Sequence, residues 1–164
     1  AGDTIKFDNE QKGGVGAVLP AFFVRSRGAG KLYGLLFTPL LERHTLTQLE
    51  ADIILFLANN PEYDTARDIV EKRHLAKAHV SVGIDALADR GLLTRFRLEG
   101  NRKTIHLRLT EKAGPIVEEG REIQRQYGEL LFAGFSKEDR RRLFTLLNRV
   151  AENVDAALAE EERN

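Results

Sequence analysis

The 164-residue sequence contains no cysteine, which excludes disulfides, thiolate metal sites and thiol-based redox sensing. It also lacks an apolar run long enough to span a bilayer and a visible signal peptide, so we expect a cytoplasmic protein with no membrane partner. The length allows one domain, or one domain with extensions that pack against a partner.

Net charge is absent as well, because 25 Lys and Arg balance 25 Asp and Glu. This balance argues against a general polyanion binder only if the charges are evenly spread. Residues 72–108 hold nine Lys or Arg and three acids, a local net charge of +6, whereas residues 1–71 and 111–164 each sum to −3. The sequence therefore has a basic centre between two mildly acidic ends.

Apolar periodicity and helix-capping signals predict a mainly α-helical chain. Residues 1–16 are polar and glycine-rich and are expected to form a flexible arm, and residues 17–45 are expected to form one or two apolar helices. Thr47 and Glu50 have the spacing of a capping box. Further helices are predicted over residues 47–59, 65–73, 76–90, 110–132 and from 136 onward.

Two short strands are predicted at residues 93–98 and 104–109, joined by a turn at residues 99–103. In the second strand Ile105 and Leu107 alternate with polar residues, which is the period of a sheet with one buried face. A helix, a short turn, a second helix and a hairpin, in this order, are typical of a winged helix-turn-helix domain. In such a domain the second helix enters the major groove of DNA, and a basic hairpin can reach the minor groove and phosphates.

The helix predicted at residues 76–90 has an inward stripe of Val80, Ile84 and Leu87, which leaves the opposite face for base contacts. Thr65 begins the preceding helix, whose N-terminal amides suit a phosphate. The candidate DNA-contacting residues are Thr65, Lys77, Ala78, His79, Ser81, Val82, Arg95, Arg97, Asn101, Arg102 and Lys103. The alternative is that the basic hairpin is a solvated face and that the winged helix binds a protein.

The last helix carries a long apolar stripe that nothing within the domain covers. Together with the apolar segment 17–45, this stripe predicts a homodimer. The sequence thus divides into a flexible arm at residues 1–16, N-terminal dimerisation helices at 17–45, a winged helix-turn-helix domain at 46–110 and C-terminal dimerisation helices at 111–164. The stripe consists of Leu143, Leu147, Val150, Val154 and Leu158.

Other chemistries have little support. The four histidines are scattered over different predicted elements, whereas a metal site wants clustered ligands, so no metal or other cofactor is predicted. The glycines of residues 28–31 lack the spacing and the preceding strand of a phosphate-binding loop. Because no nucleophile, base and acid are arranged together by position, we do not expect an enzyme.

The sequence resembles the multiple-antibiotic-resistance regulator (MarR) family of winged-helix transcription factors over about residues 46–114. The resemblance implies a prokaryotic homodimer, with intertwined terminal helices, that binds a near-palindromic DNA operator. It also implies a repressor, and many such proteins release DNA when a small, often aromatic or phenolic anion binds. The segments that carry the resemblance are LTQLEADIILFLANN, TARDIVEKRHLAKAHVSVGIDALADRGLLTR and NRKTIHLRLTEKA.

The sequence departs from the family pattern at several candidate contacts. The family's hairpin usually carries Asp-Arg-Arg where this sequence has residues 101–103, Asn-Arg-Lys, so Arg102 lacks the acid that would brace it. Ala78 and His79 occupy positions often filled by Ser and Thr, and Val82 replaces a frequent Arg. A valine there could meet a thymine methyl group.

A ligand pocket is predicted where the dimerisation helices meet the DNA-binding domain. The residues expected there combine aromatic walls with a few polar groups, a composition that suits a flat, weakly acidic ligand. The alternative is that the same aromatic side chains pack solidly against each other. The predicted pocket residues are Phe22, Phe23, Arg25, Tyr33, Phe37, His44 and Phe56.

Overall fold

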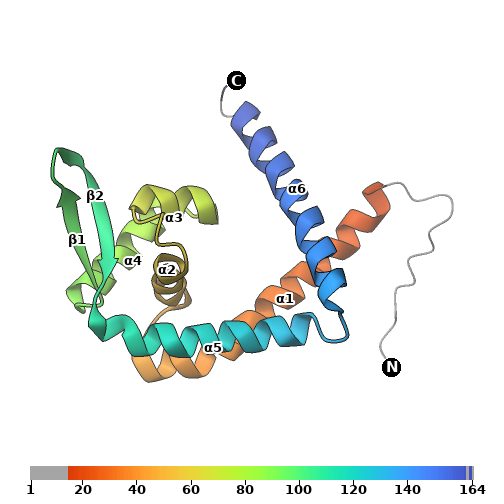
Figure 1. Ribbon diagram of the computed structural model, residues 1–164, viewed down its shortest axis with the longest axis horizontal. Helices are drawn as coiled ribbons and strands as arrows, with labels where there is room; N and C mark the ends of the chain where they lie inside the picture. The colour runs from red at the N-terminus through yellow and green to blue at the C-terminus, as the bar shows by residue number, and fades with distance from the viewer. Residues whose placement is uncertain (1–14, 162, 164) are drawn as a thin grey trace. The chain divides into compact units, whose positions relative to one another are not determined.

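A computed structural model describes residues 15–161 and 163, without the side chains of residues 15–25 and 102. The flexible arm predicted at residues 1–16 lies outside the described residues except for its last two positions. The elements, shown in Figure 1, are α1 (Val15–His44), α2 (Gln48–Asn59), α3 (Ala66–Arg73), α4 (Lys77–Asp89), β1 (Leu93–Leu98), β2 (Asn101–Leu109), a 3-10 turn (Glu111–Ala113), α5 (Gly114–Leu131) and α6 (Lys137–Glu161).

The chain forms two compact units, which divide between Ile123 and Gln124. In the first unit α2, α3 and α4 pack together, and the β1–β2 hairpin lies next to α4 (Figure 1). The core of this unit is built from the apolar stripes that the sequence predicts. Its largest fully buried side chains are Phe37, Leu40, Ile53, Ile54, Ile69, Val80, Leu87 and Leu93.

Local capping groups fix where the helices begin. The hydroxyl of Thr47 accepts a hydrogen bond from the amide of Glu50 at 3.2 Å, and the Glu50 carboxylate accepts one from the Thr47 amide at 2.8 Å. Ser136 and Asp139 form the equivalent pair of bonds before α6. Each pair satisfies two amides that the helix itself cannot satisfy, so both predicted starts are confirmed.

The N-terminal segment is a single helix of 30 residues rather than two. Its glycines at positions 28, 30 and 34 do not interrupt it, although each costs about 1 kcal/mol relative to alanine. The C-terminal part of α1 is held by packing, because Phe37 and Leu40 are completely buried. Tertiary burial therefore outweighs weak local propensity in this helix.

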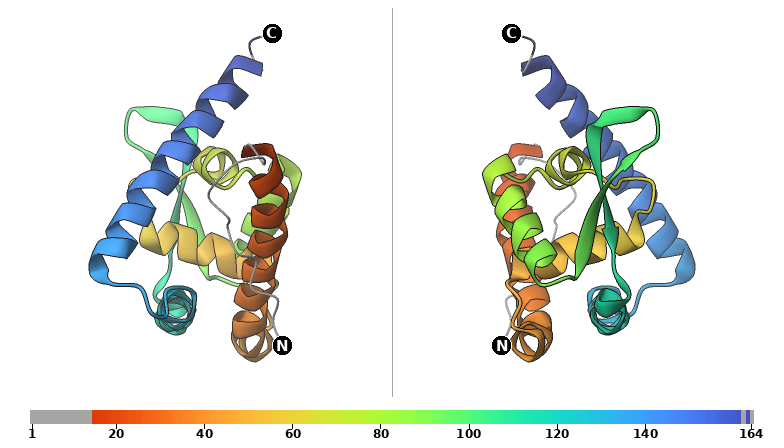
Figure 2. Two further views of the ribbon diagram at one scale, coloured as in Figure 1. Left: turned by 90° about the vertical axis from the view of Figure 1, so that its right-hand side faces the viewer. Right: turned by 90° about the vertical axis from the view of Figure 1, so that its left-hand side faces the viewer.

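The hairpin is tighter than the sequence predicts. β2 begins at Asn101, so the expected five-residue turn shortens to Glu99 and Gly100, and Gly100 adopts a φ of +84°. The register shifts between Phe96 and Leu98 of β1, and opposite this shift the side-chain oxygen of Asn101 accepts hydrogen bonds from the amides of Lys103 (3.3 Å) and Thr104 (3.4 Å). The asparagine thus organises residues 101–104, and Figure 2 shows the two strands as one twisted ribbon.

Two further details of the second strand and its exit differ from the sequence prediction. Ile105 remains 43% exposed, so the buried face of β2 is carried by Leu107 and the partly buried Leu109. Thr110 does not cap the following helix with its side chain; its hydroxyl donates to the carbonyl of Gly91 at 2.7 Å. That bond ties the end of the hairpin to the end of α4, and the chain enters α5 through the 3-10 turn instead.

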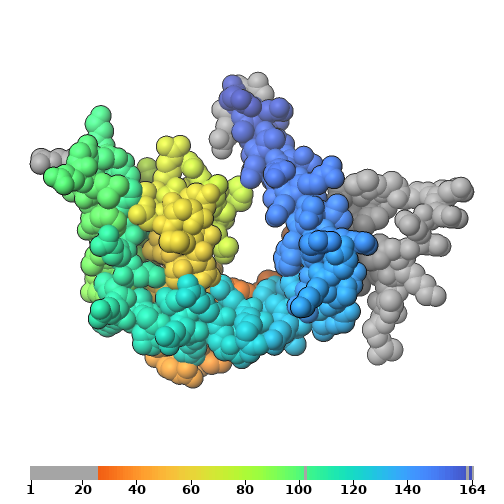
Figure 3. All heavy atoms as spheres, in the orientation of Figure 1, coloured from red at the N-terminus to blue at the C-terminus, as the bar shows by residue number. Residues whose placement is uncertain are grey.

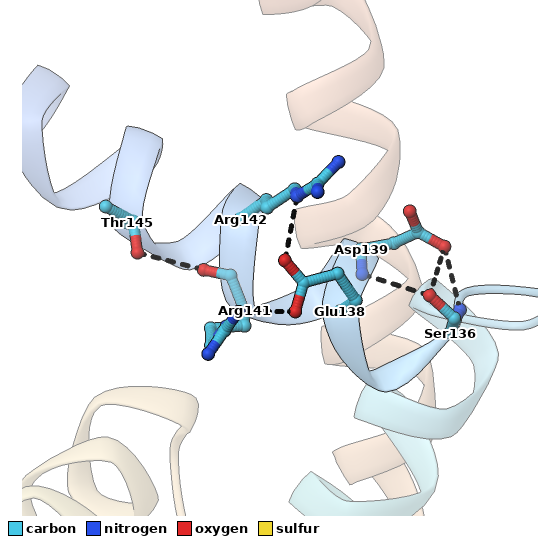
Figure 4. A network of polar contacts seen from close by, with 6 residues as sticks. All are labelled: Ser136, Glu138, Asp139, Arg141, Arg142 and Thr145. Atoms are coloured by element: carbon cyan, nitrogen blue, oxygen red, sulfur yellow. Dashed lines mark hydrogen bonds and ion pairs between the residues drawn. The ribbon is translucent and has the colours of Figure 1, made fainter.

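In the second unit a polar network stabilises the first turns of α6 (Figure 4). Glu138 accepts hydrogen bonds from Arg141 at 2.6 Å and from Arg142 at 2.8 Å. No residue of α6 is buried within the single chain. The large apolar side chains that this helix exposes are Phe144, Leu146, Leu147, Val150, Val154 and Leu158.

Candidate nucleic-acid interface

The fourth helix presents one face to the core and the other to solvent. Val80, Ile84 and Leu87 are between 0% and 3% exposed. Gly83 lies on the same inner face, where a Cβ atom would sit 2.7 Å from Cδ1 of Ile53, so α4 packs very closely on α2. The predicted contact residues of this helix all lie on the outer, exposed face: Lys77, Ala78, His79, Ser81 and Val82.

The hairpin carries a second set of exposed candidates. Arg97, Asn101 and Lys103 are exposed, and the space-filling view shows the hairpin, in green, projecting beside α3 (Figure 3). Arg102 lies in β2, but its side chain is outside the described residues. Arg108 stacks on the ring of Phe96, with 4.4 Å between the guanidinium carbon and the ring centroid.

Arg95 forms an ion pair with Asp85 of α4. This pair links the hairpin to the outer face of α4, and both side chains are only partly shielded from solvent. Part of the positive charge predicted for DNA is therefore neutralised by an acid on the same surface. Sequence analysis placed Arg95 among the candidate contacts but could not pair it with Asp85, because their proximity depends on how β1 packs on α4.

Arg90 also has a role that the sequence did not reveal. It ends α4 and donates to the carbonyl oxygens of Thr45 at 2.9 Å and His44 at 2.5 Å. Its guanidinium lies 3.9 Å from the Glu50 carboxylate. This cation of the basic centre thus joins the end of α4 to the turn between α1 and α2.

The N terminus of α3 is already supplied with negative charge. The Asp68 carboxylate accepts a hydrogen bond from the Thr65 amide at 2.9 Å, and the Asp68 amide donates to the Thr65 hydroxyl at 3.1 Å. Nearby, Asp64 lies 2.7 Å from Nδ1 of His106 on β2. A phosphate at this terminus would face the Asp68 carboxylate, so we rank Thr65 below the residues of α4 and the hairpin.

A cavity of about 380 Å³ opens between α3, α4 and the hairpin. Val70 and Ile105 supply apolar walls, and Lys77, Ser81 and Arg95 contribute polar groups from the candidate DNA-contacting set. Sequence analysis missed this cavity. Ile105 lines the cavity and is therefore only partly buried, whereas the alternating pattern of the strand predicted a buried side chain at this position.

The predicted ligand-pocket residues fall into two groups. The side chains of Phe22, Phe23 and Arg25 lie outside the described residues, although their backbone is part of α1. The other four lie at the junction of α1, α2 and α5. Phe37 is fully buried with the ring of Tyr33 at 4.5 Å between centroids, Phe56 is buried, and Nε2 of His44 lies 3.2 Å from the Glu119 carboxylate.

Within residues 15–161 and 163, no group of three His, Asp or Glu side chains could hold a metal ion. No helix within those residues has the length and apolar character needed to cross a membrane.

The packed helices, the exposed face of α4 and the projecting hairpin define a winged helix-turn-helix protein. Residues 44–103 match the model of the MarR family. This segment is thus similar to the MarR family, and the chain as a whole has the fold of solved MarR-family transcriptional regulators.

Three solved structures illustrate the similarity. One, described as a MarR-family regulator from Listeria monocytogenes complexed with a 26-mer DNA, has a TM-score of 0.73 at 17% identity, covering 89% of this chain and 94% of its own. The MepR–DNA complex of S. aureus has a TM-score of 0.66 at 16% identity, covering 80% and 94%. Bordetella bronchiseptica BpsR, whose DNA binding is regulated by 6-hydroxynicotinic acid, has a TM-score of 0.62 at 21% identity, covering 80% and 98%.

Proposed function

We propose that this protein is a sequence-specific DNA-binding transcriptional repressor that acts as a homodimer on a near-palindromic operator in the prokaryotic cytoplasm. The observation that carries the proposal is the joint exposure of the outer face of α4 and the adjacent basic hairpin on a MarR-family winged helix. An α-helix fits the major groove, and the hairpin cations lie where they can contact flanking phosphates.

The exposed apolar face of α6 supports the homodimer. Stable dimers bury surfaces of this kind, since each Å² of apolar area removed from water contributes about 25 cal/mol. In a symmetric dimer the two recognition helices must lie about 34–36 Å apart to enter successive major grooves. The near-palindromic operator follows from that two-fold symmetry.

Charge on the interface predicts a moderate salt dependence of DNA binding. Lys77, Arg97 and Lys103 are exposed, and on two subunits they give roughly six phosphate contacts and a slope of about −5 for log K against log salt. Other cations of the basic centre contact residues of their own chain: Lys72, Arg90, Arg95 and Arg108.

The decisive experiment is a mobility shift with the intergenic DNA beside the protein's own gene, repeated over a series of salt concentrations. Lys103→Ala should weaken binding to every sequence and reduce the steepness of the salt slope by about 2 per dimer. Lys137→Ala, which removes an exposed cation at the start of α6, is the matched control and should leave the slope unchanged. If the protein is instead a protein-interaction subunit, neither the wild type nor the variants should give a sequence-specific shift.

We further propose that a small aromatic or anionic ligand weakens DNA binding. BpsR supports this proposal, because 6-hydroxynicotinic acid regulates its DNA binding. Two places are candidates for such a ligand: the predicted aromatic site at the α1–α2 junction, and the cavity beside α4, whose lining includes the cations Arg67, Lys77 and Arg95 together with the acid Glu71. A ligand in that cavity would cover side chains proposed to contact DNA.

Titration of salicylate or 6-hydroxynicotinic acid into the protein–DNA complex tests ligand control. Ile105→Trp, which fills the cavity, should abolish the response if the ligand binds there and preserve it if the ligand binds at the junction. Tyr33→Ala should have the opposite pattern. No release of DNA by any aromatic carboxylate would count against ligand control.

A further inference from the structure

Val82 is an apolar side chain on an exposed face of α4 that also carries His79, Ser81 and Asp85. It is 68% exposed, more than any other large apolar side chain in the described part of the chain. It lies on the outer face of α4, whereas Val80 and Ile84 on the same helix are buried. Nothing in the fold of the single chain therefore accounts for a valine at this position.

The neighbours of Val82 indicate what it can contact. Ala78 lies one helical turn before it on the same stripe, and His79 and Ser81 flank it with polar groups. The large apolar neighbours on the helix point into the core, so Val82 is not part of a wide apolar patch of the kind that docks a protein. An isolated, stiff, branched side chain instead suits an apolar target of about the size of a methyl group.

The major groove of DNA offers such a target only at thymine, whose C5 methyl group lies on the groove edge. We propose that Val82 selects thymine by packing on this methyl group, an inference that rests on the proposed DNA binding. Cytosine has a hydrogen in place of the C5 methyl group and an amino donor in place of the O4 acceptor, and valine has no acceptor for that donor. The valine thus discriminates by attraction to one base and by an unsatisfied donor on the other.

The rest of the helix face is consistent with this contact. Ala78 precedes Val82 by one turn of 5.4 Å, a span of one to two base pairs at 3.4 Å each, so it can approach the base next to the selected thymine. Asp85 follows on the same side of the helix, and its ion pair with Arg95 neutralises a carboxylate that would otherwise repel the DNA backbone. The small alanine and the paired acid both let the helix approach the groove closely.

The expected effect is modest and specific. Burying one methyl-sized group contributes about 0.8 kcal/mol, which corresponds to about a fourfold change in affinity. Removing the methyl group from one half-site should therefore raise Kd about fourfold, and removing it from both half-sites should raise Kd about 15-fold.

The test begins with selection of tight-binding duplexes from random DNA by the full-length protein. Each thymine of the selected site is then replaced by deoxyuridine, which lacks only the methyl group, and Kd is measured by fluorescence anisotropy for the wild type and for Val82→Ala. The wild type should lose affinity at one symmetric position, and Val82→Ala should be insensitive at that position while it remains sensitive to base changes elsewhere. Because Val82 is exposed, its variant should keep the wild-type melting temperature, which checks the fold.

The outcomes separate the two levels of the inference. If the protein selects DNA but no deoxyuridine changes Kd, or if Val82→Ala keeps the full methyl sensitivity, thymine selection by Val82 is wrong and DNA binding stands. If no duplex is enriched or bound at any salt concentration, the proposed function fails together with this inference.

Discussion

A methyl group added at Gly120 should disturb the contact that holds α5 on the winged helix. A Cβ atom at this position would lie 2.8 and 2.9 Å from the two methyl carbons of Leu55 and 3.2 Å from its Cγ. Carbon atoms pack best at about 3.5–4.0 Å. Since both methyl groups and the branch point are too close, and Leu55 is only 2% exposed, rotation of one bond cannot relieve the overlap.

The magnitude follows from two opposing effects. Overpacking a core costs typically 1–3 kcal/mol, whereas replacing glycine by alanine inside a helix stabilises it by about 1 kcal/mol. Gly120→Ala should therefore lower the free energy of unfolding by about 0–2 kcal/mol. Gly128, in the same helix, has nothing within 4 Å of its virtual Cβ, so Gly128→Ala should raise that free energy by up to about 1 kcal/mol.

Urea denaturation followed by circular dichroism measures both variants, at one protein concentration because the proposed dimer makes stability concentration-dependent. Both variants gain the same helix propensity from the glycine-to-alanine change, so the difference between their free energies of unfolding gives the cost of the overlap with Leu55. Equal stability of Gly120→Ala and Gly128→Ala would refute the close packing of α5 on α2.

Three further perturbations test other contacts. Burial raises the pKa of Asp52, although the hydrogen bond from Gln48 opposes the shift, so its ionisation destabilises the fold. Asp52→Asn should therefore be more stable than the wild type at pH 7, and the difference should shrink as the pH falls through the raised pKa and vanish below the ordinary value of 3.8. Arg90→Ala should weaken operator binding because it releases the end of α4 from the α1–α2 turn, and Arg90→Lys should retain part of the affinity. Equal affinity of the wild type and both variants in a mobility shift would exclude this positioning role. Thr45 adopts a left-handed φ of +52°, so Thr45→Asn should raise the melting temperature, with a gain of up to about 1 kcal/mol in the free energy of unfolding.

Most helix positions could be predicted from the sequence because their signals are local. The capping boxes that begin α2 and α6 need only a hydroxyl and a carboxylate three residues apart. The buried stripe of α4 follows from the spacing of Val80, Ile84 and Leu87, and it also determines which residues face outward. The outer face of the recognition helix was therefore predictable without knowledge of any neighbour.

The roles of individual cations were not predictable, because they depend on contacts between segments that are distant in sequence. Arg90 contacts backbone atoms 45 and 46 residues earlier, and Arg95 reaches Asp85 only because β1 packs beside α4. The hairpin turn differs from the prediction for a local reason. The side-chain oxygen of Asn101 accepts hydrogen bonds from the amides of Lys103 and Thr104, which the pattern of apolar residues does not reveal, and β2 begins at Asn101.

The pairing of Arg95 with Asp85 has a consequence for how a ligand could act. The pair joins the hairpin to the recognition helix across one side of the cavity that Arg95 and Ser81 help to line. A ligand carboxylate in that cavity would compete with Asp85 for the Arg95 guanidinium. If the bound ligand lowers the affinity for DNA by some factor, bound DNA must lower the affinity for the ligand by the same factor. If this coupling operates, Asp85→Asn should bind an aromatic carboxylate more tightly than the wild type in the absence of DNA, because the guanidinium no longer has a competing partner. Calorimetric titration of salicylate into both proteins measures the difference, and an unchanged or weaker affinity of Asp85→Asn would show that the ligand does not use Arg95.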